Sequence, residues 1–285
     1  MHPLPFKIID SHLHFWNPER LHYPWLTAVP TIAGKQTPEE LLHAHPFTEN
    51  IEAIFVQAEC QTEQALDEVA WVTELSEKFP WIKGIVAYVP MNQGEETQKL
   101  LKILEKNRLV KGIRHQLQTE VDASFCLKSD FIQGVQSLAD RNLVFDLCIK
   151  NNQLPEATKL VESSPQNCFV LDHFGNATLN DNSLEQWKKD LRTIAEMPHV
   201  SVKLSGLLTQ LPANSDPQKI SSIFKIVLEA FGPQRALFGS DWPVLNLNGN
   251  YDQWLEMVLQ ETAHLSEENR QAIFSGNSKR IYHLT

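Results

Sequence analysis

The most informative stretch of the chain is Phe6-Lys7-Ile8-Ile9-Asp10-Ser11-His12-Leu13-His14, in which an apolar run leads directly into two histidines. A short apolar run of this kind predicts a buried β-strand. Side chains alternate along an extended chain, so His12 and His14 would point to the same side. Two imidazoles in this arrangement can bind one divalent metal ion, although a lone pair also occurs in surface turns. Their role therefore depends on what the rest of the chain brings near them.

The remainder of the chain alternates short strands with amphipathic helices. Runs typical of strands cover residues 6–10, 53–57, 84–89, 110–114, 144–148, 168–172, 200–204 and 236–239, and helical spacing covers 63–78, 97–107, 130–142, 155–163, 184–197 and 217–231. Eight such units predict a single (β/α)8 barrel of the TIM type over residues 1–285. A doubly wound open sheet is the alternative, but Ser11-His12-Leu13 stands where its glycine-rich turn would be.

Composition excludes several classes of protein. The 35 acidic residues outnumber 25 basic ones, and the charge of -10 without long runs of like charge argues against nucleic acid or anionic membranes as partners. No apolar stretch approaches the ~20 residues of a membrane span, and a signal-peptide pattern is missing, so we expect a cytoplasmic protein. The cysteines, Cys60, Cys126, Cys148 and Cys168, lie far apart and are expected to be buried thiols.

Polar residues follow several predicted strands at the end where barrel enzymes carry their chemistry. They are His12 and His14 after the first strand, Gln57 and Glu59 after the second, Arg114 and His115 after the fourth, Asp172 and His173 after the sixth, and Ser240 and Asp241 after the eighth. Gln57, Glu59 and Asp172 are also suitable caps for neighbouring helices or loops, and His115 points away from Arg114 by strand alternation. The roles of Glu59, His115 and Asp172 stay open, whereas Asp241 is the leading candidate for a catalytic base.

Five ordered segments resemble the signatures of the amidohydrolase-2 branch of the amidohydrolase superfamily. They are Ile9-Asp10-Ser11-His12-Leu13-His14-Phe15-Trp16, Gly112-Ile113-Arg114-His115, Leu171-Asp172-His173-Phe174-Gly175, Lys203-Leu204-Ser205-Gly206 and Gly239-Ser240-Asp241-Trp242-Pro243. Their order and spacing match over essentially the whole chain. Within the branch, Tyr23-Pro24-Trp25-Leu26 and the third segment are most similar to sugar-lactone hydrolases that open L-fucono- and L-rhamnono-lactones, with pyrone dicarboxylate lactonases as more distant relatives.

This resemblance implies a hydrolase that opens a small sugar-acid lactone. His12, His14 and Asp241 would bind a divalent metal ion, and Asp241 would also take a proton from the attacking water. His173 would be a further catalytic residue, and Arg114 would orient the substrate by holding a hydroxyl or a carboxylate. Such a metal ion would act as a Lewis acid and lower the pKa of its water.

The sequence departs from the dinuclear pattern of the superfamily. Its fourth strand offers Arg114 rather than a residue that could bridge two metals, and Phe145-Asp146-Leu147-Cys148 ends the fifth strand without a histidine. One divalent ion is therefore expected, zinc by its ligands, with manganese or nickel as alternatives. Hydrolysis without metal also stays open, with imidazoles donating to the lactone carbonyl while Asp241 serves as base.

The predicted substrate contacts are Gln57, Trp16, Trp25 and Trp242. The three tryptophans are included because an indole offers a flat apolar face to a sugar ring. A small-molecule lactone is the expected partner, and a homodimer is left open. Two other functions remain as alternatives. One is metal-dependent nonoxidative decarboxylation of a small unsaturated or aromatic acid, against which the missing histidine on the fifth strand counts. The other is a catalytically silent ligand-binding barrel, which would not need this set of histidines and Asp241.

Overall fold

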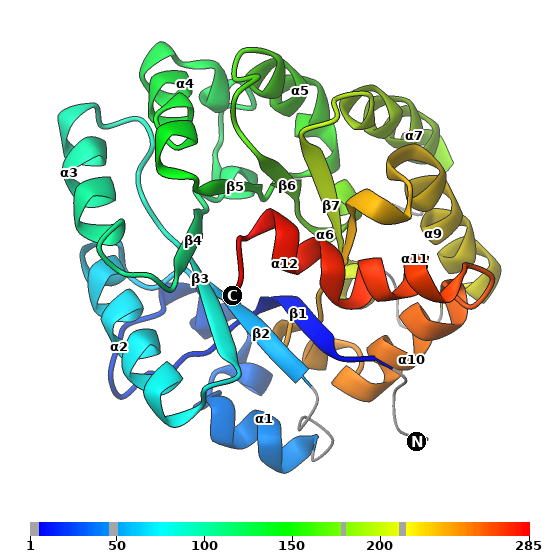
Figure 1. The fold of residues 1–285 in the computed structure, drawn as a ribbon, viewed down its shortest axis with the longest axis horizontal. Helices are drawn as coiled ribbons and strands as arrows, with labels where there is room; N and C mark the ends of the chain where they lie inside the picture. Colours follow the sequence, from blue (N-terminus) through cyan, green and yellow to red (C-terminus); the bar gives the residue numbers. More distant parts are fainter. Residues whose placement is uncertain (1–5, 46–50, 178–180, 211–214) are drawn as a thin grey trace.

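The eight strands form one parallel sheet in chain order that curls into a nearly closed barrel, as the computed structural model shows for residues 6–45, 51–177, 181–210 and 215–285 (Figure 1). They are β1 (Ile8–Leu13), β2 (Ile51–Val56), β3 (Ile82–Ala87), β4 (Val110–Ile113), β5 (Val144–Leu147), β6 (Phe169–Leu171), β7 (Val200–Leu204) and β8 (Ala236–Phe238). Each overlaps one predicted run. The predicted (β/α)8 barrel is therefore confirmed.

The strands are buried on both faces, which explains why they read as apolar runs rather than as alternating patterns. The α-helices that accompany the strands are α1 (Pro38–Ala44), α2 (Ala65–Lys78), α3 (Glu95–Leu104), α4 (Ser129–Gln136), α5 (Leu154–Glu162), α6 (His173–Asn176), α7 (Asp181–Ala195), α8 (Leu207–Gln210), α9 (Pro217–Phe231), α10 (Tyr251–Glu261), α11 (Glu267–Gln271) and α12 (Asn277–Ile281). Within the described part of the chain, none of these helices is long and apolar enough to cross a membrane.

The seam between β1 and β8 is closed beyond the ends of the two strands. Leu13 forms a parallel bridge with Trp242, whose carbonyl accepts from the amide of His14 at 2.7 Å. The amide of Asp241 donates to the carbonyl of His12 at 2.8 Å. This closure fixes both predicted histidines beside the predicted carboxylate.

The other end of the barrel is plugged by the carboxyl-terminal segment. Helix α12, drawn in red, crosses the barrel in Figure 1. Ile281 and Tyr282 pack against apolar residues of the strands, namely Ile9, Ile54, Val56, Val86, Val144, Val170 and Leu237. The hydroxyl of Tyr282 donates to Oδ1 of Asp146 at 2.7 Å inside the barrel. Access to the barrel interior is therefore left to the carboxyl ends of the strands.

The four cysteines are free thiols, as expected. Cys126 and Cys148 are buried, whereas Cys60 and Cys168 are half-buried, so the expectation of burial holds fully for the first pair.

Candidate active site

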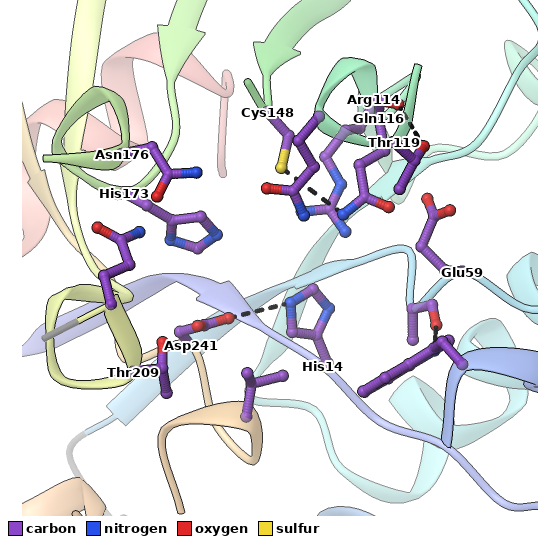
Figure 2. A pocket seen from close by; sticks show the side chains of 15 residues that line it. His14, Glu59, Arg114, Gln116, Thr119, Cys148, His173, Asn176, Thr209 and Asp241 are labelled. Carbon is purple, nitrogen blue, oxygen red and sulfur yellow. Dashed lines mark hydrogen bonds and ion pairs between the residues drawn. The ribbon is translucent and has the colours of Figure 1, made fainter. Parts of the chain in front are cut away.

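A cavity of about 380 Å³ opens at the carboxyl ends of the strands (Figure 2). Its walls bring together five of the predicted site residues, namely His14, Trp25, Arg114, His173 and Asp241. His12 lies next to these residues but is fully buried. A cavity of this size is suited to a small organic molecule.

Three atoms of His12, His14 and Asp241 converge on one point. The two Nε2 atoms lie 3.1 Å apart, and Oδ1 of Asp241 is 3.3 Å from Nε2 of His14 and 3.8 Å from Nε2 of His12. Ligand atoms about 2.1 Å from a tetrahedral metal ion are roughly 3.4 Å apart, so these separations fit one ion bound by all three.

The hydrogen bond of the His14 imidazole explains why its Nε2 faces the cluster as an acceptor. Nδ1 of His14 lies 2.7 Å from the carbonyl of Val56, which can only accept, so the ring proton is on Nδ1 and Nε2 carries a lone pair. Nδ1 of His12 lies 3.2 Å from Oδ1 of Asp172 and equally far from the ammonium nitrogen of Lys203. Burial lowers the pKa of His12 well below its usual range, so this ring stays neutral. Lone pairs and a carboxylate that meet at such distances favour a cation between them.

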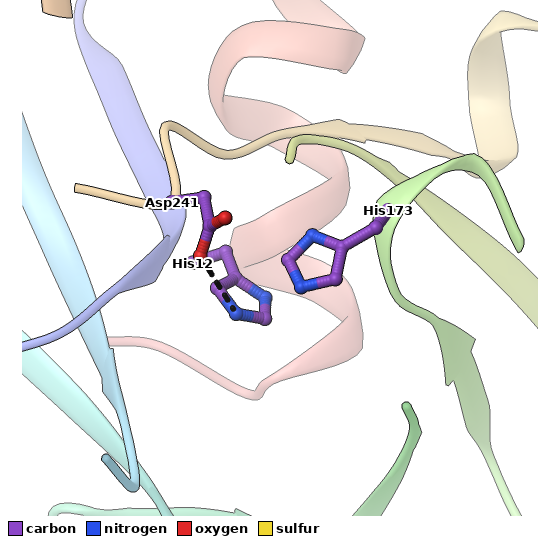
Figure 3. Close-up of side chains that lie close together, drawn as sticks. All are labelled: His12, His173 and Asp241. Atoms are coloured by element: carbon purple, nitrogen blue, oxygen red, sulfur yellow. Dashed lines mark ion pairs between the residues drawn. The ribbon is translucent and has the colours of Figure 1, made fainter. Parts of the chain in front are cut away.

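His173 lies on the other side of His12, with the two ring centroids 4.4 Å apart (Figure 3). Its Nδ1 is 2.9 Å from Oγ of Ser205, and burial lowers its pKa. Ligand atoms of His12, His173 and Asp241 lie within 4.8 Å of one another, so His173 can reach a bound ion or its water.

Two buried cations lie beside this cluster. Lys203, the next-to-last residue of β7, pairs with Asp146 and lies 3.1 Å from Oδ1 of Asp172. Nη1 of Arg114 is 3.5 Å from Oδ2 of Asp172 and 3.3 Å from Nε2 of His12. Burial alone would raise the pKa of Asp172, but Lys203 and His12 outweigh it and hold that pKa well below its usual range. Asp172 is therefore a charged carboxylate that orients His12.

Sequence reasoning assigned no role to Lys203 or Asp146. The available signal was strand alternation, because a lysine within the apolar strand β7 must lie on one of its two buried faces. Burial raises the pKa of Asp146 to about 6 even though Lys203 acts to lower it.

The local backbone turns sharply where the catalytic candidates stand. His173 and Asp241 have φ angles of 55° and 64°, a left-handed conformation that is uncommon for residues with a side chain. Gly206 allows His173 to approach, because a Cβ at this position would collide with the imidazole ring. A Cβ on Gly239 would similarly lie 2.8 Å from Cβ of His12. These glycines of the signature segments therefore make room for the two imidazoles.

The structure does not bring all predicted substrate contacts to the cavity wall. Trp16 is fully buried, and its indole N–H donates to carbonyls of Ile32 and Gly34 at 3.0 and 2.9 Å. Trp242 is 1% exposed and packs edge-on against Phe15. The two indoles pack inside the loops that follow β1 and β8. Neither Trp16 nor Trp242 therefore has an exposed face for a substrate.

Gln57 is also buried, and its contacts are with other side chains of the site. Nε2 of Gln57 donates to Oε1 of Glu59 at 2.5 Å, and the backbone carbonyl of Gln57 accepts from Nη2 of Arg114 at 2.6 Å. It therefore positions two cavity residues. His115 is buried among aromatic rings and accepts from the amide of Met91 at 3.2 Å, which fits the structural role that strand alternation indicated.

Further polar side chains in the cavity wall come from loops and short helices: Glu59, Gln116, Gln118, Thr119, Asn176, Thr209 and Gln210. Apart from Glu59, no sequence pattern singled them out, because loop conformation decides which of their side chains face the cavity.

Comparisons with known proteins agree with this geometry. The model of the amidohydrolase family matches residues 9–284. The L-fucono-1,5-lactonase of Burkholderia multivorans is 32% identical over 97% of this chain and 96% of its own. The L-rhamnono-gamma-lactonase of Scheffersomyces stipitis is 24% identical over 98% of this chain and 99% of its own. A crystal structure of a Burkholderia multivorans amidohydrolase with bound zinc is 33% identical, with a TM-score of 0.85 over 98% of this chain and 100% of that one.

Proposed function

Because this chain belongs to the amidohydrolase family, we propose that it hydrolyses the ester bond of small sugar-acid lactones of the L-fucono or L-rhamnono type. The observation that carries the proposal is the convergence of His12, His14 and Asp241 beside a cavity of about 380 Å³. The 32% identity to a lactonase over 97% of the chain supports the same substrate class.

His12, His14 and Asp241 would hold one divalent ion, for which we propose zinc. Nitrogen and carboxylate ligands suit zinc, and the similar amidohydrolase of Burkholderia multivorans was crystallised with it. Cys148, Asp172 and His173 form a second group that could hold a metal. However, Lys203 and Arg114 already pair with Asp172, so the carboxylate that a second ion would need is occupied. These charges favour a single ion.

A bound zinc ion would polarise the lactone carbonyl and increase the acidity of water. The protein supplies the proton transfers. Oδ1 of Asp241 faces the two imidazoles, which leaves its second oxygen to accept the proton of the attacking water. Asp241 would then pass this proton to the leaving ring oxygen, and His173, whose Nδ1 lies 2.9 Å from Oγ of Ser205, would hydrogen-bond the lactone carbonyl.

The cavity also argues against the decarboxylation alternative. A decarboxylase substrate carries a carboxylate, but Glu59 and Asp241 already place negative charge in the cavity wall. Arg114 is the natural partner for such a group, yet both ends of its guanidinium contact Gln57, Asp172 and His12. A neutral lactone avoids this conflict.

The test is proton release from a panel of aldono-1,4- and aldono-1,5-lactones. The purified protein is assayed as isolated, after chelation and after reconstitution with zinc, manganese or nickel. We expect turnover of one stereochemical family, loss on chelation and recovery with zinc. Silence across the panel with metal demonstrably bound would contradict the lactonase proposal. Full turnover with no metal remaining would contradict only the metal requirement. The Asp241→Asn protein serves as the blank for spontaneous hydrolysis.

A further inference from the structure

The carboxylate of Glu59 lines the cavity at a distance from the His14–Asp241 pair (Figure 2). Its φ angle is 55°, in the left-handed region that side chains rarely adopt. A residue is kept in this conformation only where its surroundings hold it, so the neighbours of Glu59 indicate whether its position is fixed.

The turn that carries Glu59 is held on every side. The side-chain oxygen of Gln57 accepts from the Glu59 amide at 2.7 Å, and Gln57 Nε2 donates to the Glu59 carboxylate at 2.5 Å. The indole of Trp25 donates to the carbonyl of Ala58 at 2.8 Å. The amide of Ala58 donates to the buried carboxyl of Glu68, at 3.2 and 3.4 Å to its two oxygens. Glu59 is therefore presented to the cavity by a rigid frame.

Gln116 stands next to Glu59 in the cavity wall. With its amide nitrogen turned toward Glu59, Gln116 donates to both carboxylate oxygens at 3.0 and 2.9 Å. A carboxylate has about four acceptor positions, so these bonds and that from Gln57 leave acceptor capacity for a ligand. Within the described part of the chain, no cation lies within ion-pair distance of Glu59, although Arg114 interacts with its charge over a longer distance.

In Arg114, the arginine of the cavity wall, both terminal nitrogens already have partners, and Nε is buried without one. Its Nη2 donates to the carbonyl of Gln57 at 2.6 Å, and its Nη1 lies between His12 and Asp172. Two-point recognition of a carboxylate needs two free parallel N–H groups. The wall around Glu59 thus favours groups that donate hydrogen bonds and carry no negative charge, which are the hydroxyls of a neutral sugar ring.

We propose that Glu59 determines specificity by accepting hydrogen bonds from the ring hydroxyls of the substrate and by repelling lactones that carry a carboxylate. This inference rests on the proposed lactonase function and adds the residue that selects the substrate. Glu59 acts in binding, whereas Asp241 acts on the water.

The experiment compares Glu59→Ala and Glu59→Gln with the parent protein, and uses Glu63→Gln, an exposed residue four positions on, as the matched control. The substrates are the best aldono-1,5-lactone, δ-valerolactone, which has the same ring without hydroxyls, and an aldaric acid monolactone, which adds a carboxylate. Circular dichroism and thermal unfolding establish that each variant is folded.

For Glu59→Ala we expect KM for the aldonolactone to rise ~10- to 100-fold, with kcat within about 3-fold, because a lost hydroxyl contact weakens binding rather than chemistry. The value of kcat/KM for δ-valerolactone should not change. Glu59→Gln keeps an acceptor but loses the charge, so its preference for the acidic over the neutral lactone should rise at least ~5-fold. Glu63→Gln should match the parent protein on all three substrates.

Equal losses on the aldonolactone and δ-valerolactone, or unchanged kinetics on both, would overturn the role of Glu59. If the parent protein hydrolyses no lactone, the proposed function fails. The role of Glu59 is then tested by calorimetry, which measures the affinity for a neutral aldonolactam, the ring amide analogue of the aldonolactone. Binding weakened at least ~10-fold by Glu59→Ala but not by Glu63→Gln would uphold the hydroxyl subsite. Equal affinity, or no binding to the parent protein, would overturn it.

Discussion

The ammonium nitrogen of Lys203 lies 3.2 Å from Nδ1 of His12, and both side chains are completely buried. Lys203 also pairs with Asp146, which accepts from the hydroxyl of Tyr282 at 2.7 Å. A continuous chain of buried polar groups therefore joins the carboxyl-terminal plug of the barrel to the candidate metal site. The ammonium balances Asp172, the carboxylate that orients His12.

Lys203→Met should lower the free energy of unfolding by about 3–5 kcal/mol, because it leaves Asp146 without its buried cation and Asp172 with only the longer contact to Arg114. Urea unfolding followed by circular dichroism measures the change. Lys225→Met is the control, since the side chain of Lys225 is 75% exposed and its loss should change stability by no more than ~0.5 kcal/mol. Equal stability of the two variants would show that the buried network is not needed for folding.

Asp241→Asn should lower kcat at least ~10²-fold, because an amide cannot accept the proton of the attacking water. Steady-state rates on the best lactone measure the effect, and thermal unfolding shows whether the fold is kept. Asp67→Asn replaces an exposed aspartate on α2 and should leave the rate unchanged. A fully active Asp241→Asn protein would exclude this carboxylate as the base.

His14→Asn should reduce the amount of zinc that remains after dialysis, because it removes one of the converging atoms and the orientation given by Val56. Elemental analysis of the dialysed proteins gives the metal content directly and does not depend on activity. The exposed His264→Asn protein should retain as much zinc as the parent. Equal zinc in both variants would place the metal elsewhere.

The sequence was sufficient to predict the barrel because the strands are buried on both faces and six of the helices show a helical period. Helix α9 spans Pro217–Phe231, the same residues that the apolar spacing indicated. The predicted stretch 130–142 instead contains α4 up to Gln136 and then a short turn that ends at Asn142 in the left-handed conformation. The spacing of apolar residues continues through such a turn, so this spacing does not show where the helix ends.

The candidate site was predicted less completely, because strand ends can be read from sequence but loop conformations cannot. His12 and His14 stand at the end of β1, His173 and Asp241 follow β6 and β8, and the four converge as the barrel geometry requires. Trp16 and Trp242 also follow strands, yet their indoles turn into the loop packing. Lys203, the next-to-last residue of β7, was not predicted because it falls within the predicted strand 200–204 and not after it.

Glu68 gives a pH dependence of stability. Burial raises the pKa of this carboxyl to about 8, compared with 4.5 for a free glutamate. The folded protein therefore holds the Glu68 proton over a range in which the unfolded chain has lost it. The resulting stabilisation is complete below about pH 4.5 and is lost as the pH rises through about 8, with a slope of up to about 1.4 kcal/mol per pH unit.

The measurement is urea unfolding of the parent protein and of Glu68→Gln between about pH 5 and pH 9. The parent should lose stability relative to Glu68→Gln as the pH rises, because glutamine cannot ionise and remains a neutral partner for the amide of Ala58. Glu77→Gln, which replaces an exposed glutamate of the same helix, should follow the parent at every pH. Parallel curves for the parent and Glu68→Gln would mean that Glu68 ionises equally in the folded and unfolded chains, which contradicts its raised pKa.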